Sequence, residues 1–191
     1  MGELAAKGQE MGFLDGVQRA YATFNRLNAS EKDAMWDAVT ANPNNAFILK
    51  AAKEEAEGWA RTLAGTFTDG LPADQVEARY RASIHNGPAD AARHCYWSAL
   101  LASKLTYNEA MRVVFTHEFN QIDSGVAQDQ LEARMDLHND RIGLEIGTRN
   151  KGASDIDLRD AVMKALFSGQ LRFIDPKAST LVPTRSLVPS I

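Results

Sequence analysis

The chain has 191 residues, a formal net charge of −4 and an apolar content of 45%. This length fits one domain with or without appendages, and the apolar fraction is sufficient for a hydrophobic core. The slightly acidic balance argues against a protein that covers nucleic-acid phosphates, so no nucleic-acid partner is expected.

The sequence predicts synthesis in the cytoplasm without a Sec signal. The first residues, MGELAAKGQEMGFLDG, contain an early acidic residue and lack the apolar stretch of a secretory signal. No apolar run approaches a membrane span. Cys95 is the only cysteine, so no intrachain disulfide can form, which fits a reducing compartment. Any export would use a non-classical or contractile route.

Helical periodicity dominates the sequence, and no alternating pattern is long enough to predict a strand. We therefore expect an all-α, bundle-like domain of about seven helices. An apolar stripe at about 11–27 comes first, and the predicted helices cover 31–40, 45–66, 73–84, 86–105, 106–122, 127–146 and 156–167. A turn is expected at 123–125. Gly147 is expected to end the helix predicted at 127–146.

Three regions are expected along the chain. Residues 1–70 form an N-terminal helical region that packs on or precedes the core, and residues 71–172 form the helical core with the candidate site. Residues 173–191 form an extended tail, because three prolines and scattered Ser and Thr exclude a helix there. This tail is either disordered or lies along a partner.

The first candidate cluster lies on the helix predicted at 86–105. Asp90, His94 and Trp97 share one helix face by their spacing. In the functional interpretation, Asp90 orients His94 as a general base or metal ligand, and Arg93 contacts an anionic group. The alternative is a helix-start carboxylate, a surface arginine and a buried histidine whose hydrogen bonds are satisfied.

The second candidate is the pair His117–Glu118. It falls short of the zinc-protease pattern H-E-x-x-H, because Gln121 stands where the second histidine is needed. The helix predicted at 106–122 needs an inward face through Ala110 and Val114. At least one of His117 and Glu118 should therefore point toward the interior. The alternative is a solvated helix face.

The third candidate is the segment MDLHND, residues 135–140. His138 falls on the apolar stripe of its helix, Asp136 and Asn139 share an adjacent face, and Asp140 lies farther round. Polar groups beside a buried histidine are costly unless a metal, a substrate or other side chains satisfy them. The alternative is a polar network that ties two helices together.

The three predicted helices are consecutive and joined by short loops, so they should be neighbours in space. His94, Glu118, Asp136 and His138 would then converge, with His117 as a further candidate. Such a set can hold a divalent metal such as Zn²⁺ or act without a metal through a histidine base. Cys95 points about 100° away from His94, which is a poor arrangement for a Cys–His pair.

Three segments resemble the signature of an uncharacterised bacterial family. They are G-P-A-D-A-A-R-H-C-Y-W (87–97), T-H-E (116–118) and M-D-L-H-N-D (135–140), against G-P-x-D-A-x-R-H-x-Y-W, His-Glu and D-x-H-N. The resemblance covers roughly 86–147. It implies a shared polar set of Asp90, Arg93, His94, Trp97, His117, Glu118, Asp136, His138 and Asn139. The family often occurs in secreted or toxin-like proteins, which implies an antibacterial effector and an immunity protein as a partner.

These observations lead to one leading hypothesis and two alternatives. The first is a hydrolase of an envelope component, phospholipid or peptidoglycan, in which His94, Glu118, Asp136 and His138 carry the chemistry. Arg93, Trp97, Asn139 and Asp90 would bind the substrate, and His94, His117, Glu118, Asp136 and His138 are the candidate metal ligands. The second is a non-enzymatic structural or cargo protein of a phage or secretion particle. The third is a metal- or small-molecule-binding module without turnover.

Overall fold

The computed structural model describes residues 29–122 and 125–184. The described part contains seven helices and one antiparallel hairpin: α2 (Ala29–Ala41), α3 (Asn45–Thr66), α4 (Ala73–Ile84), α5 (Pro88–Lys104), α6 (Tyr107–Ile122), α7 (Ala127–Arg149), α8 (Asp155–Phe167), β1 (Arg172–Asp175) and β2 (Thr180–Pro183). The prediction of an all-α fold is confirmed. The apolar stripe at 11–27 and most of the turn at 123–125 lie outside the described residues.

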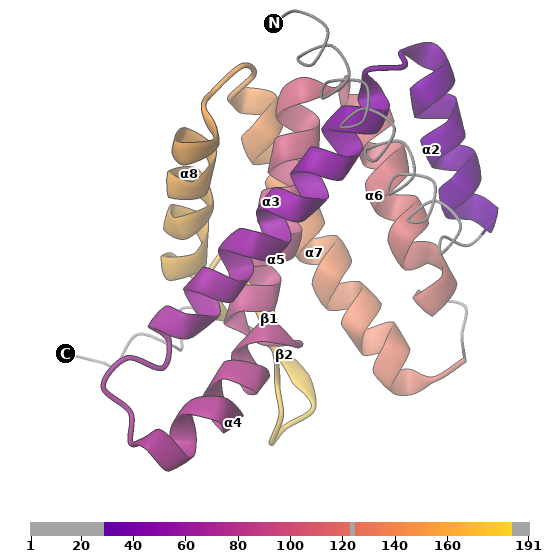
Figure 1. The fold of residues 1–191 in the computed structure, drawn as a ribbon. Helices are drawn as coiled ribbons and strands as arrows, with labels where there is room; N and C mark the ends of the chain where they lie inside the picture. The colour runs from indigo at the N-terminus through magenta and orange to yellow at the C-terminus, as the bar shows by residue number, and fades with distance from the viewer. Residues whose placement is uncertain (1–28, 123–124, 185–191) are drawn as a thin grey trace, which may run out of the picture.

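Helix α5 is the central element of the fold. It runs through the middle of the molecule, with α3 crossing in front of it, α7 beside it, and α8 and α6 on opposite sides (Figure 1). Nearly all of its residues are buried, including a run of small residues that lets α3 pack closely against it. Among the helices in the described ranges, none has the length and apolar character needed to span a membrane.

Two glycines allow α7 to pack directly against the backbone of α5. A Cβ atom at Gly143 would overlap the carbonyl oxygen of Cys95, and one at Gly147 would overlap that of Ala99. A glycine inside a predicted helix indicates that another backbone comes close, and this prediction is confirmed at Gly143. The prediction that Gly147 ends its helix is wrong, because Gly147 belongs to the contact and α7 continues to Arg149.

This contact sets which face of α7 is buried. The face that carries the two glycines turns toward α5, so Asp136, Asn139 and Asp140 are buried on it. The apolar stripe predicted through Met135 and His138 is only partly right, because Met135 is fully buried whereas His138 is half-buried.

The inward face of α3 differs from the one that its apolar residues predict. The apolar pattern of 45–66 predicts that Phe47 points inward, but Phe47 is 58% exposed. The helix instead contacts the core through small residues one turn apart, Ala52, Ala56 and Ala60. Small side chains at this spacing bring two helices together more closely than a large aromatic side chain would allow.

Helices α6 and α8 begin at reciprocal capping interactions. The Thr106 backbone N–H donates to Glu109 Oε2 at 2.9 Å, and the Glu109 N–H donates to Thr106 Oγ1 at 3.3 Å. Ser154 and Asp157 form the same arrangement at the start of α8. Both caps satisfy backbone donors that a helix start leaves open.

The tail contains a hairpin that the sequence did not predict. Strands β1 and β2 pair antiparallel, with Phe173 opposite Val182. Asn139 on α7 holds β1 by its backbone: its Nδ2 donates to the Arg172 carbonyl and its Oδ1 accepts the Arg172 N–H, both at 2.9 Å. Four-residue strands are too short for an alternating pattern to stand out in the sequence.

Candidate functional site

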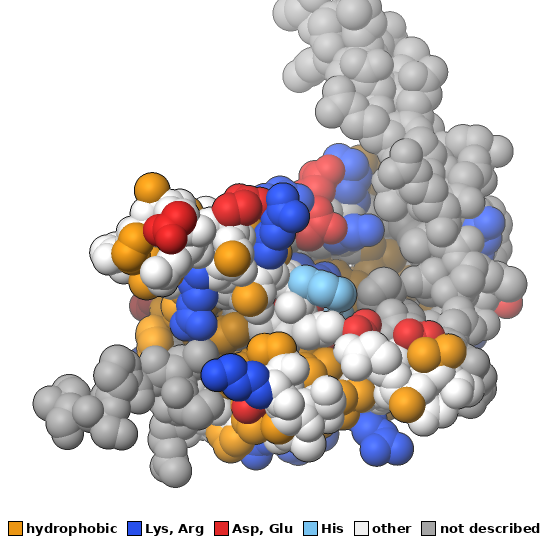
Figure 2. Space-filling view, turned by 90° about the horizontal axis from the view of Figure 1, so that it is seen from below, with side chains coloured by type: hydrophobic (Ala, Val, Ile, Leu, Met, Phe, Trp, Pro, Cys, Tyr) orange, Lys and Arg blue, Asp and Glu red, His pale blue; other side chains and the backbone are white. Residues whose placement is uncertain are grey.

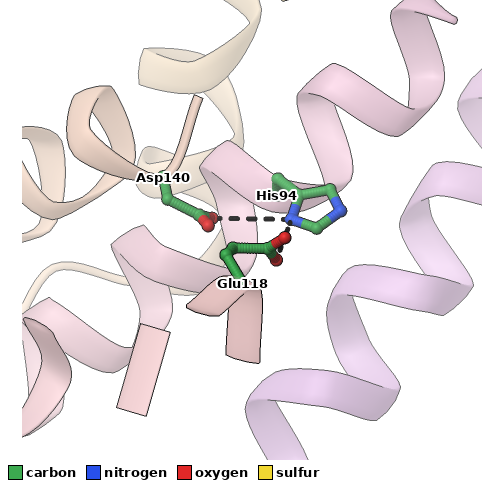
Figure 3. Close-up of side chains that lie close together, drawn as sticks. All are labelled: His94, Glu118 and Asp140. Carbon is green, nitrogen blue, oxygen red and sulfur yellow. Dashed lines mark ion pairs between the residues drawn. The ribbon is translucent and has the colours of Figure 1, made fainter. Parts of the chain in front are cut away.

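Four ionisable side chains from three helices meet beside the middle of α5. They are His94 of α5, Glu118 of α6, and Asp136 and Asp140 of α7, and we call them the His–carboxylate cluster. His94 lies between Glu118 and Asp140 in the close-up (Figure 3). All four are at most 7% exposed. The spacing of Asp136 and Asp140 places both on one face of α7.

The Nδ1 atom of His94 faces two carboxylates. It lies 3.6 Å from Asp140 Oδ1 and 3.9 Å from Glu118 Oε1, which is too far for a hydrogen bond, and it makes no hydrogen bond elsewhere. Asp140 Oδ1 also accepts a hydrogen bond from Ser98 Oγ at 2.7 Å. Ser98 therefore fixes the orientation of the Asp140 carboxylate.

The Nε2 atom of His94 faces both a donor and an acceptor. Arg93 Nη2 lies 2.6 Å from it and Asp136 Oδ1 lies 3.3 Å from it. A guanidinium can only donate and an ionised carboxylate can only accept, so Nε2 can satisfy one of them at a time. If Nε2 accepts from Arg93, a neutral ring carries its proton on Nδ1. If Nε2 donates to Asp136, Nδ1 presents a lone pair.

Asp90 positions Arg93 rather than His94. Its Oδ1 accepts from Arg93 Nε at 2.9 Å and from Arg93 Nη2 at 2.7 Å, and its Oδ2 accepts the Asn86 N–H at 2.7 Å. The prediction that Asp90 orients His94 directly is therefore wrong. Asp90 holds Arg93, and the Arg93 guanidinium contacts His94. Asp90 is 4% exposed and Arg93 is half-buried, so the carboxylate of this ion pair is shielded from water.

Burial dominates the acid–base behaviour of the cluster. It raises the pKa of Asp136 to about 8, and the neighbouring carboxylates of Glu118 and Asp90 add to the rise while His94 opposes it. Burial also lowers the pKa of His94, although Asp136 partly offsets the effect. For Arg93, burial alone would lower the pKa, but Asp90 reverses the direction. A neutral His94 at neutral pH is able to act as a metal ligand or a base.

A recess opens beside the Arg93–Asp90 pair. It has a volume of about 320 Å³ and lies between α3, α4 and the start of α5; its lining residues are Glu57, Ala60, Arg61, Ile84, His85, Asp90 and Arg93. Arg93 both lines the recess and contacts His94, so it lies between the recess and the cluster. Acidic, basic and histidine side chains come close together near the middle of the face seen from below (Figure 2).

Several predicted site residues lie away from the cluster. His138 points elsewhere, because it is two residues from Asp136 on α7, and its Nε2 lies 2.8 Å from the Gln170 carbonyl oxygen. The expectation that it converges with His94 is therefore corrected. Asn139 uses its amide to hold β1, and Trp97 packs half-buried against the apolar core. The side chain of His117 lies outside the described part.

Asp140 takes the place that was expected for His138. The sequence placed Asp140 too far round the helix to take part. The signal that could have found it is its spacing, four residues after Asp136 and three before Gly143, once Gly143 is taken to mark the face that touches α5.

Comparison with known families gives one match. Residues 72–170, just over half of the chain, match the family described as a domain of unknown function, DUF6973. The chain belongs to this family. No curated protein and no solved structure gives a significant match. The DUF6973 domain runs from the residue before α4 to just before β1, and it contains every member of the His–carboxylate cluster.

The DUF6973 domain thus encloses an imidazole with carboxylates near both ring nitrogens. Such a set can accept a proton from water, hold a cation, or tie three helices together. Nucleophilic chemistry by Cys95 does not fit, because burial raises the pKa of its thiol well above the usual value and keeps the thiolate from forming.

Proposed function

We propose that this protein is a hydrolase that acts on a polar component of the bacterial envelope, with the His–carboxylate cluster as its water-activating site. The observation that carries the proposal is the connection between the cluster and the recess. Arg93 lines the recess and also contacts His94, so a group bound there would lie next to the cluster. A buried carboxylate with a raised pKa beside an imidazole, as Asp136 is beside His94, is typical of acid–base sites.

The roles follow from the chemistry of each group. A cluster carboxylate or His94 would take the proton from an attacking water, whose oxygen forms a bond to the scissile carbonyl or phosphoryl centre while the leaving group departs. Arg93, held by Asp90, would face the negative charge on the substrate or on the developing oxyanion. The recess carries charges of both signs, which suits a lipid headgroup or a peptidoglycan stem. An antibacterial effector that leaves the cell by a non-Sec route is the biological setting we propose.

A direct test compares the purified wild type with two nearly isosteric variants, Glu118→Gln and Asp140→Asn. The substrates are anionic phospholipid vesicles, followed by fatty-acid and headgroup release, and peptidoglycan sacculi, followed by soluble fragments. We expect hydrolysis of one class by the wild type and a loss of at least about 100-fold in both variants. Glu54→Gln removes an exposed carboxylate on α3 and should retain full activity.

Two results would overturn the hydrolase proposal. One is the failure of the folded wild type to hydrolyse either class of substrate. The other is unchanged hydrolysis in both variants while circular dichroism shows an intact helical fold.

A second candidate function is supported by the burial of the cluster. Glu118 and Asp140 are fully buried and connect α6 and α7 with α5, as expected for a polar network that fixes helix register in a structural or cargo protein. In that case Glu118→Gln and Asp140→Asn should lower the free energy of unfolding by about 1–3 kcal/mol, and no activity should separate wild type from variant.

A further inference from the structure

We infer that His94 Nδ1, Glu118 and Asp140 form a binding site for one divalent cation of the zinc class, with a fourth position open to water. The inference concerns the cluster on which the proposed function rests, but its readout is metal binding rather than turnover. Imidazole nitrogen and carboxylate oxygen are ligands that Zn²⁺ accepts readily, and three protein ligands with an open position are typical of catalytic zinc sites.

The spacing of the three ligand atoms fits a shared cation. One ligand atom from each of the three residues lies within 4.8 Å of the other two. The two separations from His94 Nδ1, 3.6 and 3.9 Å, exceed hydrogen-bonding distance. Tetrahedral zinc with bonds of about 2.0–2.2 Å places neighbouring ligand atoms about 3.3–3.6 Å apart. The observed spacing is thus too wide for direct hydrogen bonds and only slightly wider than ligands around a shared cation require.

The Nδ1 atom of His94 is buried and lacks a hydrogen bond, which also favours a bound cation. The ring is 3% exposed, and this nitrogen is buried without a hydrogen bond while pointing at two carboxylate oxygens (Figure 3). Buried polar atoms in native proteins are almost always satisfied by protein, water or an ion. A cation at the point that Nδ1 and the two carboxylates share would give Nδ1 the partner that it lacks.

The residues behind the ligands also fit a cation site. Asp136 lies on the far side of the ring, 3.3 Å from Nε2. In the cation-bound form Nε2 donates to Asp136 in place of its contact with Arg93 Nη2, which leaves the Nδ1 lone pair for the cation. Ser98 Oγ holds Asp140 Oδ1 at 2.7 Å. A carboxylate behind a ligating histidine and a hydrogen bond to a ligating carboxylate are regular features of metal sites. Asp136 and Ser98 are therefore positioning residues and not ligands.

Calorimetric titration of the untagged full chain with ZnCl₂, after removal of bound metal with a chelator, tests the inference. We expect one equivalent to bind and to raise the melting temperature. Glu118→Gln and Asp140→Asn should weaken Zn²⁺ binding by more than about 100-fold, and Asp136→Asn by about 10- to 100-fold. Glu54→Gln should bind Zn²⁺ as the wild type does. Co²⁺ in place of Zn²⁺ should give the visible absorption of a tetrahedral site in the wild type and not in Asp140→Asn.

Two results of the titration would contradict the cation site. If Zn²⁺, Mn²⁺ and Mg²⁺ all fail to bind the folded wild type, His94 keeps its proton on Nδ1 and the site holds no cation. If Zn²⁺ binds equally to wild type, Glu118→Gln and Asp140→Asn, it occupies an unrelated surface site. Hydrolysis by a folded wild type that binds none of these cations would overturn the cation site and leave the hydrolase proposal standing. Zn²⁺ binding without hydrolysis of either substrate class would support the cation site and overturn the hydrolase proposal.

Discussion

At the scale of single residues, the two nitrogens of His94 define the site. Nε2 faces Arg93 and Asp136, and Nδ1 faces Glu118 and Asp140. The protonation of the ring therefore depends on which neighbour of Nε2 it engages. Because Arg93 both pairs with Asp90 and lines the recess, its removal should change the stability of the fold as well as the site.

Arg93→Met should destabilise the protein, because it leaves the Asp90 carboxylate buried without its cation. We expect a loss of about 3–5 kcal/mol in the free energy of unfolding, as is typical when one member of a buried ion pair is removed. Urea denaturation measures this loss.

The control for Arg93→Met is the double variant Asp90→Asn/Arg93→Met, which removes both charges. It should recover a large part of the lost stability, which gives a positive coupling energy in the double-mutant cycle. Equal losses in the single and double variants would show that the ion pair is not the cause.

The sequence identified most of the residues of this site but not their exact partners. His94, Glu118 and Asp136 were predicted to converge, and they do. His138 was included and Asp140 was left out, because the face of α7 was judged from its apolar residues. That judgement fails where two helices touch through glycine, since the buried face then carries small and polar residues.

At the scale of elements, the α5–α7 contact holds the site together. Gly143 lies against the backbone of Cys95 and next to Ser98, which in turn holds Asp140. Any side chain at Gly143 would separate the two helices that carry His94 and Asp140. The contact that stabilises the fold is thus also the one that sets the geometry of the cluster.

Gly143→Ala should be strongly destabilising, by about 1–3 kcal/mol or more, because the methyl group meets a backbone carbonyl that cannot move aside. Gly58→Ala on α3 is the matched comparison, since a Cβ there meets nothing within 4 Å. It should be neutral or stabilising by up to about 1 kcal/mol, because alanine is the better helix former. Similar melting temperatures for the two variants would contradict the close α5–α7 contact.

The cap of α6 predicts a dependence on pH. Hydrogen bonds from the Thr106 hydroxyl and backbone lower the pKa of Glu109 below its usual 4.5. The interaction therefore stabilises the fold fully above that pH and is lost as the pH falls through the lowered pKa.

Thr106→Ala tests this dependence by removing the hydroxyl of the cap. It should cost about 0.5–2 kcal/mol at pH 7. Denaturation at pH 7 and pH 3 should show a smaller difference from wild type at the lower pH; a constant difference would rule out the charged cap.

At the scale of the whole molecule, the Asn139 side chain is one of the contacts that tie the hairpin to the helical core, beside the Ile174 N–H that donates to the Asn86 carbonyl. Asn139→Ala would leave the part-buried backbone N–H and carbonyl of Arg172 without their partner, at a cost of about 2–4 kcal/mol for two hydrogen bonds. Hydrogen exchange should show faster exchange of the β1 amides in this variant. Asn150→Ala, which removes a side-chain bond only to its own helix, is the comparison and should leave β1 protected.

The overall architecture was more predictable than its details. Helix-start residues and periodicity located the helices of the described ranges, because capping and periodicity are local properties of the chain, although the helix end predicted at Gly147 is wrong. The hairpin and the true inward faces of α3 and α7 depend on which helices touch, and that information is not local. The central arrangement of α5 follows from its small residues only once its neighbours are known.

The most direct test of the account is hydrolysis by wild type and Glu118→Gln, measured beside their free energies of unfolding. The account predicts that Glu118→Gln loses at least about 100-fold in activity, while its stability stays equal to or above that of the wild type because a buried charge has been removed. A variant that is less stable than the wild type and shows no separable change in activity would contradict it.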